Sequence, residues 1–209
     1  MSRLDSSGNT GAELVKEAIQ RQLNRSGNTL LCGLEPLDDA EFFAEGPSGI
    51  SAAWSVGHLA CVCDLFSSWF DHDELVLEKS FHRTFNELGI ALSGGVSKAA
   101  KVNRERFSKE LLFACFRRAQ IKALRTLAAF DVRLWNAADP PAAPDTLLTC
   151  GAVWEHLAVH TYWHLGELAG SMPRFFGTYT LNTLPHFFYE PPGTGKGGAV
   201  CGTDWTSSM

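Results

Sequence analysis

Apolar residues recur every three or four positions along most of the chain, a spacing typical of amphipathic helices. The alternation of apolar and polar residues that marks half-buried strands is almost absent. The spacing predicts four main helices, which we place at residues 11–25, 55–70, 97–130 and 146–176. Long helices joined by loops favour an all-α fold, here an antiparallel four-helix bundle.

Capping and helix-breaking residues set the expected boundaries of these helices. Thr10 and Glu13 match a capping box at the start of the first helix, and Ser26-Gly27-Asn28 is expected to end it. Ser55 is the expected N-cap of the second helix. Residues 139–144 contain three prolines and cannot continue a helix, so they are expected to link the third helix to the fourth.

The length of the chain, 209 residues, suits a single domain with at most an appendage. We assign residues 1–177 to the bundle and expect residues 71–95, within it, to be part short helix and part loop. Residues 178–209 contain an aromatic stretch followed by a glycine-rich stretch, and there we expect an irregular C-terminal tail.

The third helix combines an apolar seam with a basic face. The seam consists of residues three or four positions apart: Leu112, Phe116, Ala119, Ala123 and Leu127. The basic face consists of Arg104, Arg106, Arg117, Arg118, Lys122 and Arg125. A solvated surface is the simpler explanation for these charges, and an anion-binding wall for an acidic substrate is the alternative. Arg118 and Arg174 are candidate anchors for such a ligand.

Charge and composition exclude several classes of function. The net charge of −5 gives no electrostatic reason to bind nucleic acid. No apolar run approaches the roughly 18 residues needed to span a membrane, and the polar N-terminus predicts no secretory signal. We therefore expect a cytoplasmic protein, whose six cysteines are small buried residues rather than disulfide partners.

The most informative pattern lies in the fourth predicted helix, where His156, His160 and His164 follow one another at steps of four. Each imidazole then lies nearly above the last, with a drift of roughly 40° per step. In a chain with seven histidines such a series is expected by chance only about 0.01 times. Imidazoles one helical turn apart can bind one metal ion, whereas burying several without a partner costs desolvation energy.

A metal site needs a further ligand from another helix. His58 is the natural candidate, because it lies near the start of the second predicted helix, whose apolar face must pack inward. His72 and His82 lie among charged residues and are expected at the surface, and His186 lies near the C-terminal tail.

Two motifs together resemble a known family. A Trp-x-x-Gly-His pattern ends at His58, and in the fourth helix His160-x3-His164 is followed by Gly166 and Glu167. With the helix order and the long third helix, these motifs resemble the DinB/YfiT-like superfamily of metal-binding four-helix bundles. The likeness is greatest to the bundle that begins the ergothioneine-type sulfoxide synthases, and it covers about residues 10–177. Many relatives instead place the first ligand eight residues after the tryptophan, where this chain has Val62.

The resemblance implies a ligand set and a chemistry. The implied metal ligands are His58, His160 and His164, with a divalent ion that we expect to be zinc, although imidazoles also suit nickel and iron. His156 and Glu167 are the implied catalytic neighbours, Glu167 by orienting a ligand imidazole. The family includes thiol S-transferases that use bacillithiol, mycothiol or glutathione, and thiol-dependent isomerases. The expected activity is therefore attack of a metal-activated low-molecular-weight thiol on a small electrophile.

Two other classes of function stay open. One is a metal-dependent hydrolase or lyase-type biosynthetic enzyme, which would need no added thiol. The other is a non-catalytic binding protein of the same fold. The residues also leave the oligomeric state open, and the resemblance implies a homodimer as one option.

Overall fold

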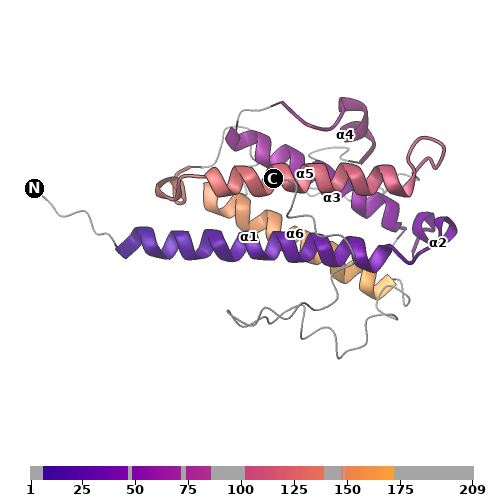
Figure 1. Cartoon of the computed structure of the whole chain (residues 1–209), viewed down its shortest axis with the longest axis horizontal. Coiled ribbons are helices and arrows are strands. Elements are labelled where there is room, and N and C mark those ends of the chain that lie inside the picture. The colour runs from indigo at the N-terminus through magenta and orange to yellow at the C-terminus, as the bar shows by residue number, and fades with distance from the viewer. Residues whose placement is uncertain are drawn as a thin grey trace, which may run out of the picture.

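The computed structural model describes residues 7–46, 49–71, 74–85, 102–138, 147 and 149–171. These residues form six α-helices and one short 3-10 helix, with no β-strand among them (Figure 1). The elements are α1 (Ser7–Leu34), α2 (Asp39–Phe43), α3 (Ala52–Asp71), α4 (Lys79–Phe85), α5 (Lys109–Ala129), η1 (Val132–Leu134) and α6 (Cys150–Ser171). The all-α prediction is confirmed for this part of the chain.

The four long helices lie side by side, and α1 and α3 each pack against both α5 and α6 (Figure 1). Helices α3 and α5 run in the same direction. Lys122 Nζ on α5 lies 3.3 Å from Asp64 Oδ1 on α3. Further along both helices, Thr126 Oγ1 donates a hydrogen bond to Asp71 Oδ2 at 2.7 Å. The expectation of an antiparallel arrangement is therefore wrong for this pair.

The segment that ends in α4 accounts for this parallel pair. The backbone N–H of Val76 donates to Asp64 Oδ1 at 3.0 Å, whereas the last residue of α4, Phe85, lies against His58 near the start of α3. The chain thus returns along α3 before α5 begins. The expected short helix within residues 71–95 is confirmed as α4, and residues 86–95 lie outside the described part.

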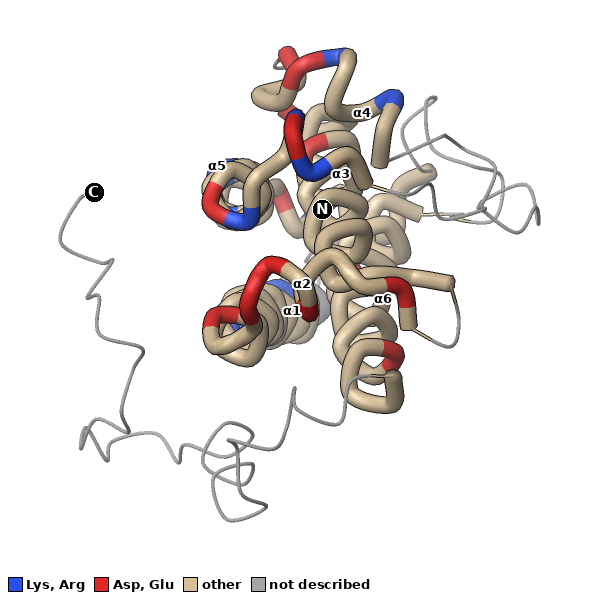
Figure 2. The backbone as a smooth tube through the Cα atoms, turned by 90° about the vertical axis from the view of Figure 1, so that its right-hand side faces the viewer, with Lys and Arg blue, Asp and Glu red and all other residues tan. Residues whose placement is uncertain are grey.

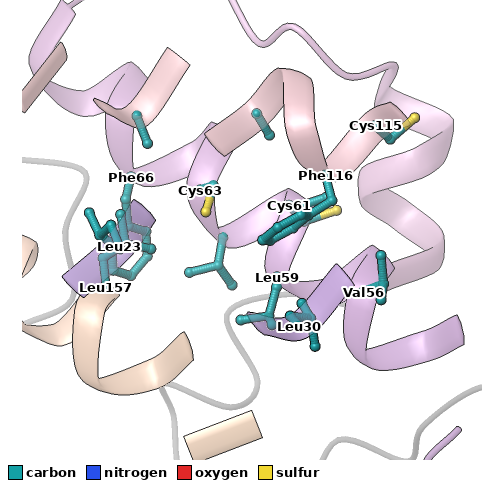
Figure 3. Close-up of a cluster of buried hydrophobic side chains, with 14 of the residues drawn as sticks. Leu23, Leu30, Val56, Leu59, Cys61, Cys63, Phe66, Cys115, Phe116 and Leu157 are labelled. Atoms are coloured by element: carbon teal, nitrogen blue, oxygen red, sulfur yellow. The ribbon is translucent and has the colours of Figure 1, made fainter. Parts of the chain in front are cut away.

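The predicted seam of the third helix faces the core. All five of its residues are buried: Leu112, Phe116, Ala119, Ala123 and Leu127. Figure 3 shows part of this core, where side chains from all four long helices gather, among them Leu23, Leu30, Leu59, Phe66, Phe116 and Leu157. The periodic apolar pattern therefore identified the buried face correctly.

Five of the six cysteines are described, and all five are free thiols. Four of them are buried: Cys61, Cys63, Cys115 and Cys150. Burial raises the pKa of the Cys63 thiol to about 12, so this thiol stays protonated and unreactive. The prediction that the cysteines are buried apolar residues is confirmed for these four, Cys32 is half-buried, and Cys201 lies outside the described residues.

The first helix is longer than expected. Helix α1 begins before Thr10, which is therefore not its N-cap, and continues through Ser26-Gly27-Asn28. Gly27 lies within the helix, and its lack of a side chain makes room for a residue of α5. The Gln120 side chain occupies the space that a Cβ on Gly27 would fill, and its Nε2 donates to the carbonyl oxygen of Leu23 at 2.7 Å.

The other long helices also begin at residues other than those expected, because different hydroxyl groups cap them. Ser51 Oγ accepts the N–H of the residue three positions on, so Ser55 lies inside α3. Ser108 Oγ caps α5 in the same way, and the residues from 102 to 108 are not helical. Thr149 Oγ1 caps α6.

The basic face predicted on the third helix is divided in the structure. Arg104 and Arg106 precede α5, Arg118 and Arg125 are exposed on it, and Lys122 pairs with the buried Asp64 carboxylate. The expected linker at residues 139–144 and the expected tail at residues 178–209 lie outside the described part of the chain.

Charged residues are sparse on α3 and α6. The tube in Figure 2 is mostly tan along these two helices, and the blue and red positions gather on α1, α5 and the turns around α4. Among the described helices, none is both long enough and apolar enough to cross a bilayer.

Gly27 provides a test of the contact between α1 and α5. Replacing it with alanine should lower the free energy of unfolding by about 1–3 kcal/mol, because overpacking displaces the buried Gln120 amide from its hydrogen bond. Urea unfolding followed by circular dichroism measures the change.

Gly166 on α6 is the matched control, since a Cβ placed there meets nothing within 4 Å. Gly166→Ala should raise stability by about 0.5–1 kcal/mol, the usual gain in helix propensity. The steric explanation would be rejected if Gly27→Ala were stabilising to the same extent as Gly166→Ala.

Candidate metal centre

Three histidines from two helices meet at one point. His58 lies near the start of α3, and His160 and His164 lie one turn apart on α6. The Nε2 atom of His160 is 3.0 Å from Nε2 of His58 and 3.2 Å from Nε2 of His164. If one ring nitrogen is taken from each of the three histidines, no two of these nitrogens are more than 4.8 Å apart. The structure thus brings together the three histidines that were predicted to bind a metal ion, in a group that could hold one.

The outer ring nitrogens of two of these histidines face acceptors. His58 Nδ1 lies 3.0 Å from the carbonyl oxygen of Phe85, and His164 Nδ1 lies 2.8 Å from Glu167 Oε2. A carbonyl or carboxylate oxygen only accepts, so the hydrogen bond to Phe85 places the ring hydrogen of His58 on Nδ1, and the Glu167 carboxylate favours the same position in His164 although that contact is not well aligned. The Nε2 atoms of His58 and His164 then carry lone pairs directed at the common point.

His160 Nε2 cannot satisfy both neighbours by itself. In a neutral imidazole this nitrogen carries either one hydrogen or one lone pair, and it faces two lone pairs at once. A divalent cation would accept a lone pair from all three nitrogens. Ligands about 2.0–2.1 Å from a tetrahedral zinc ion lie roughly 3.3 Å from one another, which is close to the distances of His160 Nε2 from the other two Nε2 atoms. The donor set therefore fits a metal ion.

Burial keeps two of the imidazoles, those of His58 and His160, in the neutral form that binds metals. Desolvation by burial, followed by the neighbouring His164, lowers the pKa of His58 to about 4. Burial also lowers the pKa of His160 to about 2, with further contributions from His164, His58 and His156. Protonation therefore does not compete with a metal ion at these two residues near neutral pH.

Aromatic rings hold the histidines from the sides. The indole of Trp54 stacks on His58 with ring centroids 4.7 Å apart and planes 7° from parallel. His156 lies outside the ligand set and stacks between His160, at 5.4 Å, and Phe66, at 5.9 Å. The structure thus places His156 beside the three converging histidines.

Glu167 connects the centre with the surface of α6. Its Oε2 and His164 Nδ1 are both buried, and neither makes a well-aligned hydrogen bond within the described residues despite their short separation. Its Oε1 accepts from Trp163 Nε1 at 2.8 Å, and Trp163 is 65% exposed. Proximity to His164 lowers the pKa of Glu167, which keeps this carboxylate ionised. The Glu167 carboxylate therefore lies beside the outer ring nitrogen of His164.

The centre lies toward one side of the helix packing. His58 and His164 are buried, whereas His160 is only half-buried and Val159 beside it is exposed. Of these three histidines, His160 is therefore the most exposed to solvent.

Among the other candidate residues, Arg118 and His82 are described, and neither is joined to the three histidines by a contact within the described residues. Arg118 is exposed on α5. Arg174, His72 and His186 lie outside the described part. The expectation that His82 is a surface residue is wrong, because its Nε2 lies 3.0 Å from Asp64 Oδ2 and its side chain is 12% exposed.

Sequence reasoning missed two groups that support the site. The role of the Phe85 carbonyl could not be predicted from the sequence, because every residue has a backbone carbonyl group. Asp64 does leave a signal in the sequence, since it is a lone acid within the apolar run of α3. Comparison of the chain with protein-family models, with curated proteins and with solved structures gave no match, so the motifs quoted above alone carry the resemblance to the DinB/YfiT-like superfamily.

Proposed function

We propose that this chain is a metal-dependent enzyme of the DinB/YfiT-like type that acts on a small molecule. Its metal ligands are His58, His160 and His164, and the ion is zinc, with nickel or iron as alternatives. The observation that carries the proposal is the convergence of three Nε2 atoms, two of them on rings whose Nδ1 atoms face an oxygen acceptor. Oxygen partners of this kind typically orient ligating histidines.

Three histidines converge within the described residues, and three protein ligands suit catalysis better than a purely structural role. Structural zinc sites use four protein ligands, and catalytic sites use three and keep a position for water or substrate. When bound, such an ion lowers the pKa of a coordinated water or thiol, or polarises a carbonyl group. The half-buried His160 marks the side from which a substrate would approach.

The more specific proposal is thiol S-transfer or thiol-dependent isomerisation, and it rests on the resemblance of the motifs to the DinB/YfiT-like superfamily. In the transfer, the thiol sulfur forms a bond to an electrophilic carbon while the leaving group departs with its electron pair. The thiol proton needs an acceptor. His156 is suited to this role, because it is half-buried beside His160 and burial lowers its pKa, which keeps the imidazole neutral.

The test is turnover of an electrophile by protein loaded with zinc. Monobromobimane and chlorodinitrobenzene are offered with bacillithiol, mycothiol or glutathione, and product is followed by fluorescence or absorbance. We expect turnover with at least one thiol, and no turnover after the metal is removed with a chelator. His156→Ala should lower the rate by about 100-fold or more, within the usual contribution of a general base.

The other outcomes identify the alternatives. If no combination of thiol and electrophile reacts, the transferase proposal is rejected. Turnover of a substrate without added thiol would favour a hydrolase or lyase, and protein that retains no stoichiometric metal would favour a non-catalytic bundle.

A further inference from the structure

Helix α4 packs against α3 beside the proposed metal ligand His58. The phenyl ring of Phe85, the last residue of α4, lies directly over Gly57 and occupies the space that a Cβ there would fill. Phe85 is 1% exposed, so its ring is enclosed by protein rather than by solvent. The residue after Gly57 is the ligand His58, and the carbonyl oxygen of the same Phe85 lies 3.0 Å from its Nδ1.

We infer that Phe85, seated on Gly57, is a positioning residue that orients His58 as a metal ligand, an inference that rests on the proposed metal centre. Phe85 acts through its backbone carbonyl, and Gly57 sets how closely that carbonyl approaches. The hydrogen bond fixes the hydrogen of His58 on Nδ1 and turns Nε2 toward His160. One face of the imidazole is covered by Trp54, whose indole is nearly parallel to it.

Two further sets of contacts fix α4 in place. The rings of Phe81, Phe85 and Phe107 pack against one another with centroids between 4.7 and 5.7 Å apart. Asp64 accepts hydrogen bonds from the backbone N–H groups of Val76 and Leu77 just before α4. Helix α4 is thus held by hydrogen bonds just before its first residue and by ring packing at Phe81 and Phe85, and a ligand-orienting group requires such support.

Gly57→Ala is the direct test. The new methyl group should push the Phe85 ring away and carry its carbonyl out of reach of His58. We expect the affinity for Zn²⁺, measured by competition with a chromophoric chelator, to fall by about 10- to 100-fold, the usual cost of losing an outer-shell partner. The d–d spectrum of the Co²⁺-loaded protein should also change, because the ligand geometry changes. Gly166→Ala, two residues after His164 and with open space around it, should leave the affinity unchanged.

A rescue experiment separates positioning from general damage to the fold. In Gly57→Ala combined with Phe85→Leu, the smaller side chain makes room for the new methyl group while the backbone carbonyl remains. The double variant should regain most of the lost affinity. Phe85→Ala alone keeps Gly57 but removes the ring that anchors the carbonyl, and it should also bind metal more weakly.

The metal-free protein gives an independent measurement. Nitrogen-15 chemical shifts of His58 should report the Nδ1–H tautomer in the wild type and a mixture of tautomers in Gly57→Ala. The inference is overturned if folded Gly57→Ala binds Zn²⁺ as tightly as the wild type. It is also overturned if Phe85→Ala binds normally and the double variant recovers nothing. A wild-type protein that binds no Zn²⁺ would instead reject the proposed metal centre itself.

Discussion

Replacing His160 with alanine should abolish stoichiometric metal binding while the protein keeps its helical content. His160 Nε2 is the shared neighbour of the other two ligand nitrogens, at 3.0 and 3.2 Å, so its loss leaves His58 and His164 without a common partner. The loss in affinity should exceed the roughly 10- to 100-fold that follows from removing an outer-shell group. Elemental analysis of the purified protein and circular dichroism together measure the two outcomes.

His156→Ala is the matched control for that experiment. His156 lies one turn earlier on the same helix and stacks against His160, but it is not among the three converging ligands. It should therefore retain about one equivalent of metal even if its activity is lost. Unchanged metal content in His160→Ala would remove His160 from the ligand set and, with it, the proposed centre.

The proximity of the histidines on α6 could be predicted from their spacing, because the periodicity of an α-helix fixes which residues share a face. Residues four positions apart lie on one face, so the spacing groups His156, His160 and His164, and the motif resemblance selects His160 and His164 among them. His58 was harder to predict, because its proximity to α6 depends on how two helices pack. The apolar surroundings of His58 indicated burial, and a motif resemblance supplied the rest.

The direction of the helices and their first residues could not be predicted in the same way. The parallel pair α3 and α5 results from the return of the chain through α4, and that return depends on the burial of Asp64 against backbone N–H groups. The Ser26-Gly27-Asn28 segment is typical of a helix end, yet Gly27 lies inside α1. The Gln120 side chain occupies the space that a side chain on Gly27 would fill. In both cases a contact between segments distant in sequence overrides the local preference.

Asp64→Ala should be strongly destabilising, lowering the free energy of unfolding by about 3–5 kcal/mol. The Asp64 side chain is fully buried, and it accepts from two backbone N–H groups while pairing with His82 and Lys122 at 3.0 and 3.3 Å. Removing it leaves the Lys122 ammonium, 9% exposed, without its carboxylate partner. Denaturant unfolding measures the loss.

Glu17→Ala is the control for the Asp64 experiment, because Glu17 pairs with Arg21 on the exposed surface of α1. An exposed pair contributes about 0–1 kcal/mol, so this variant should be nearly as stable as the wild type. If Asp64→Ala cost no more than Glu17→Ala, the buried carboxylate would not be what holds α4 against α3.

The pH dependence of stability gives a second measurement on Asp64. Burial by itself would raise the pKa of this carboxyl, but the hydrogen bonds from His82, Val76 and Leu77 and the charge of Lys122 bring it below its usual value of 3.8. A carboxyl whose pKa is lower in the folded state stabilises the protein above its unfolded pKa. That contribution is lost as the pH falls below about 4 and through the folded pKa. Asp64→Ala should therefore show a flatter decline in stability over that acidic range than the wild type, whereas Glu17→Ala should follow the wild-type curve.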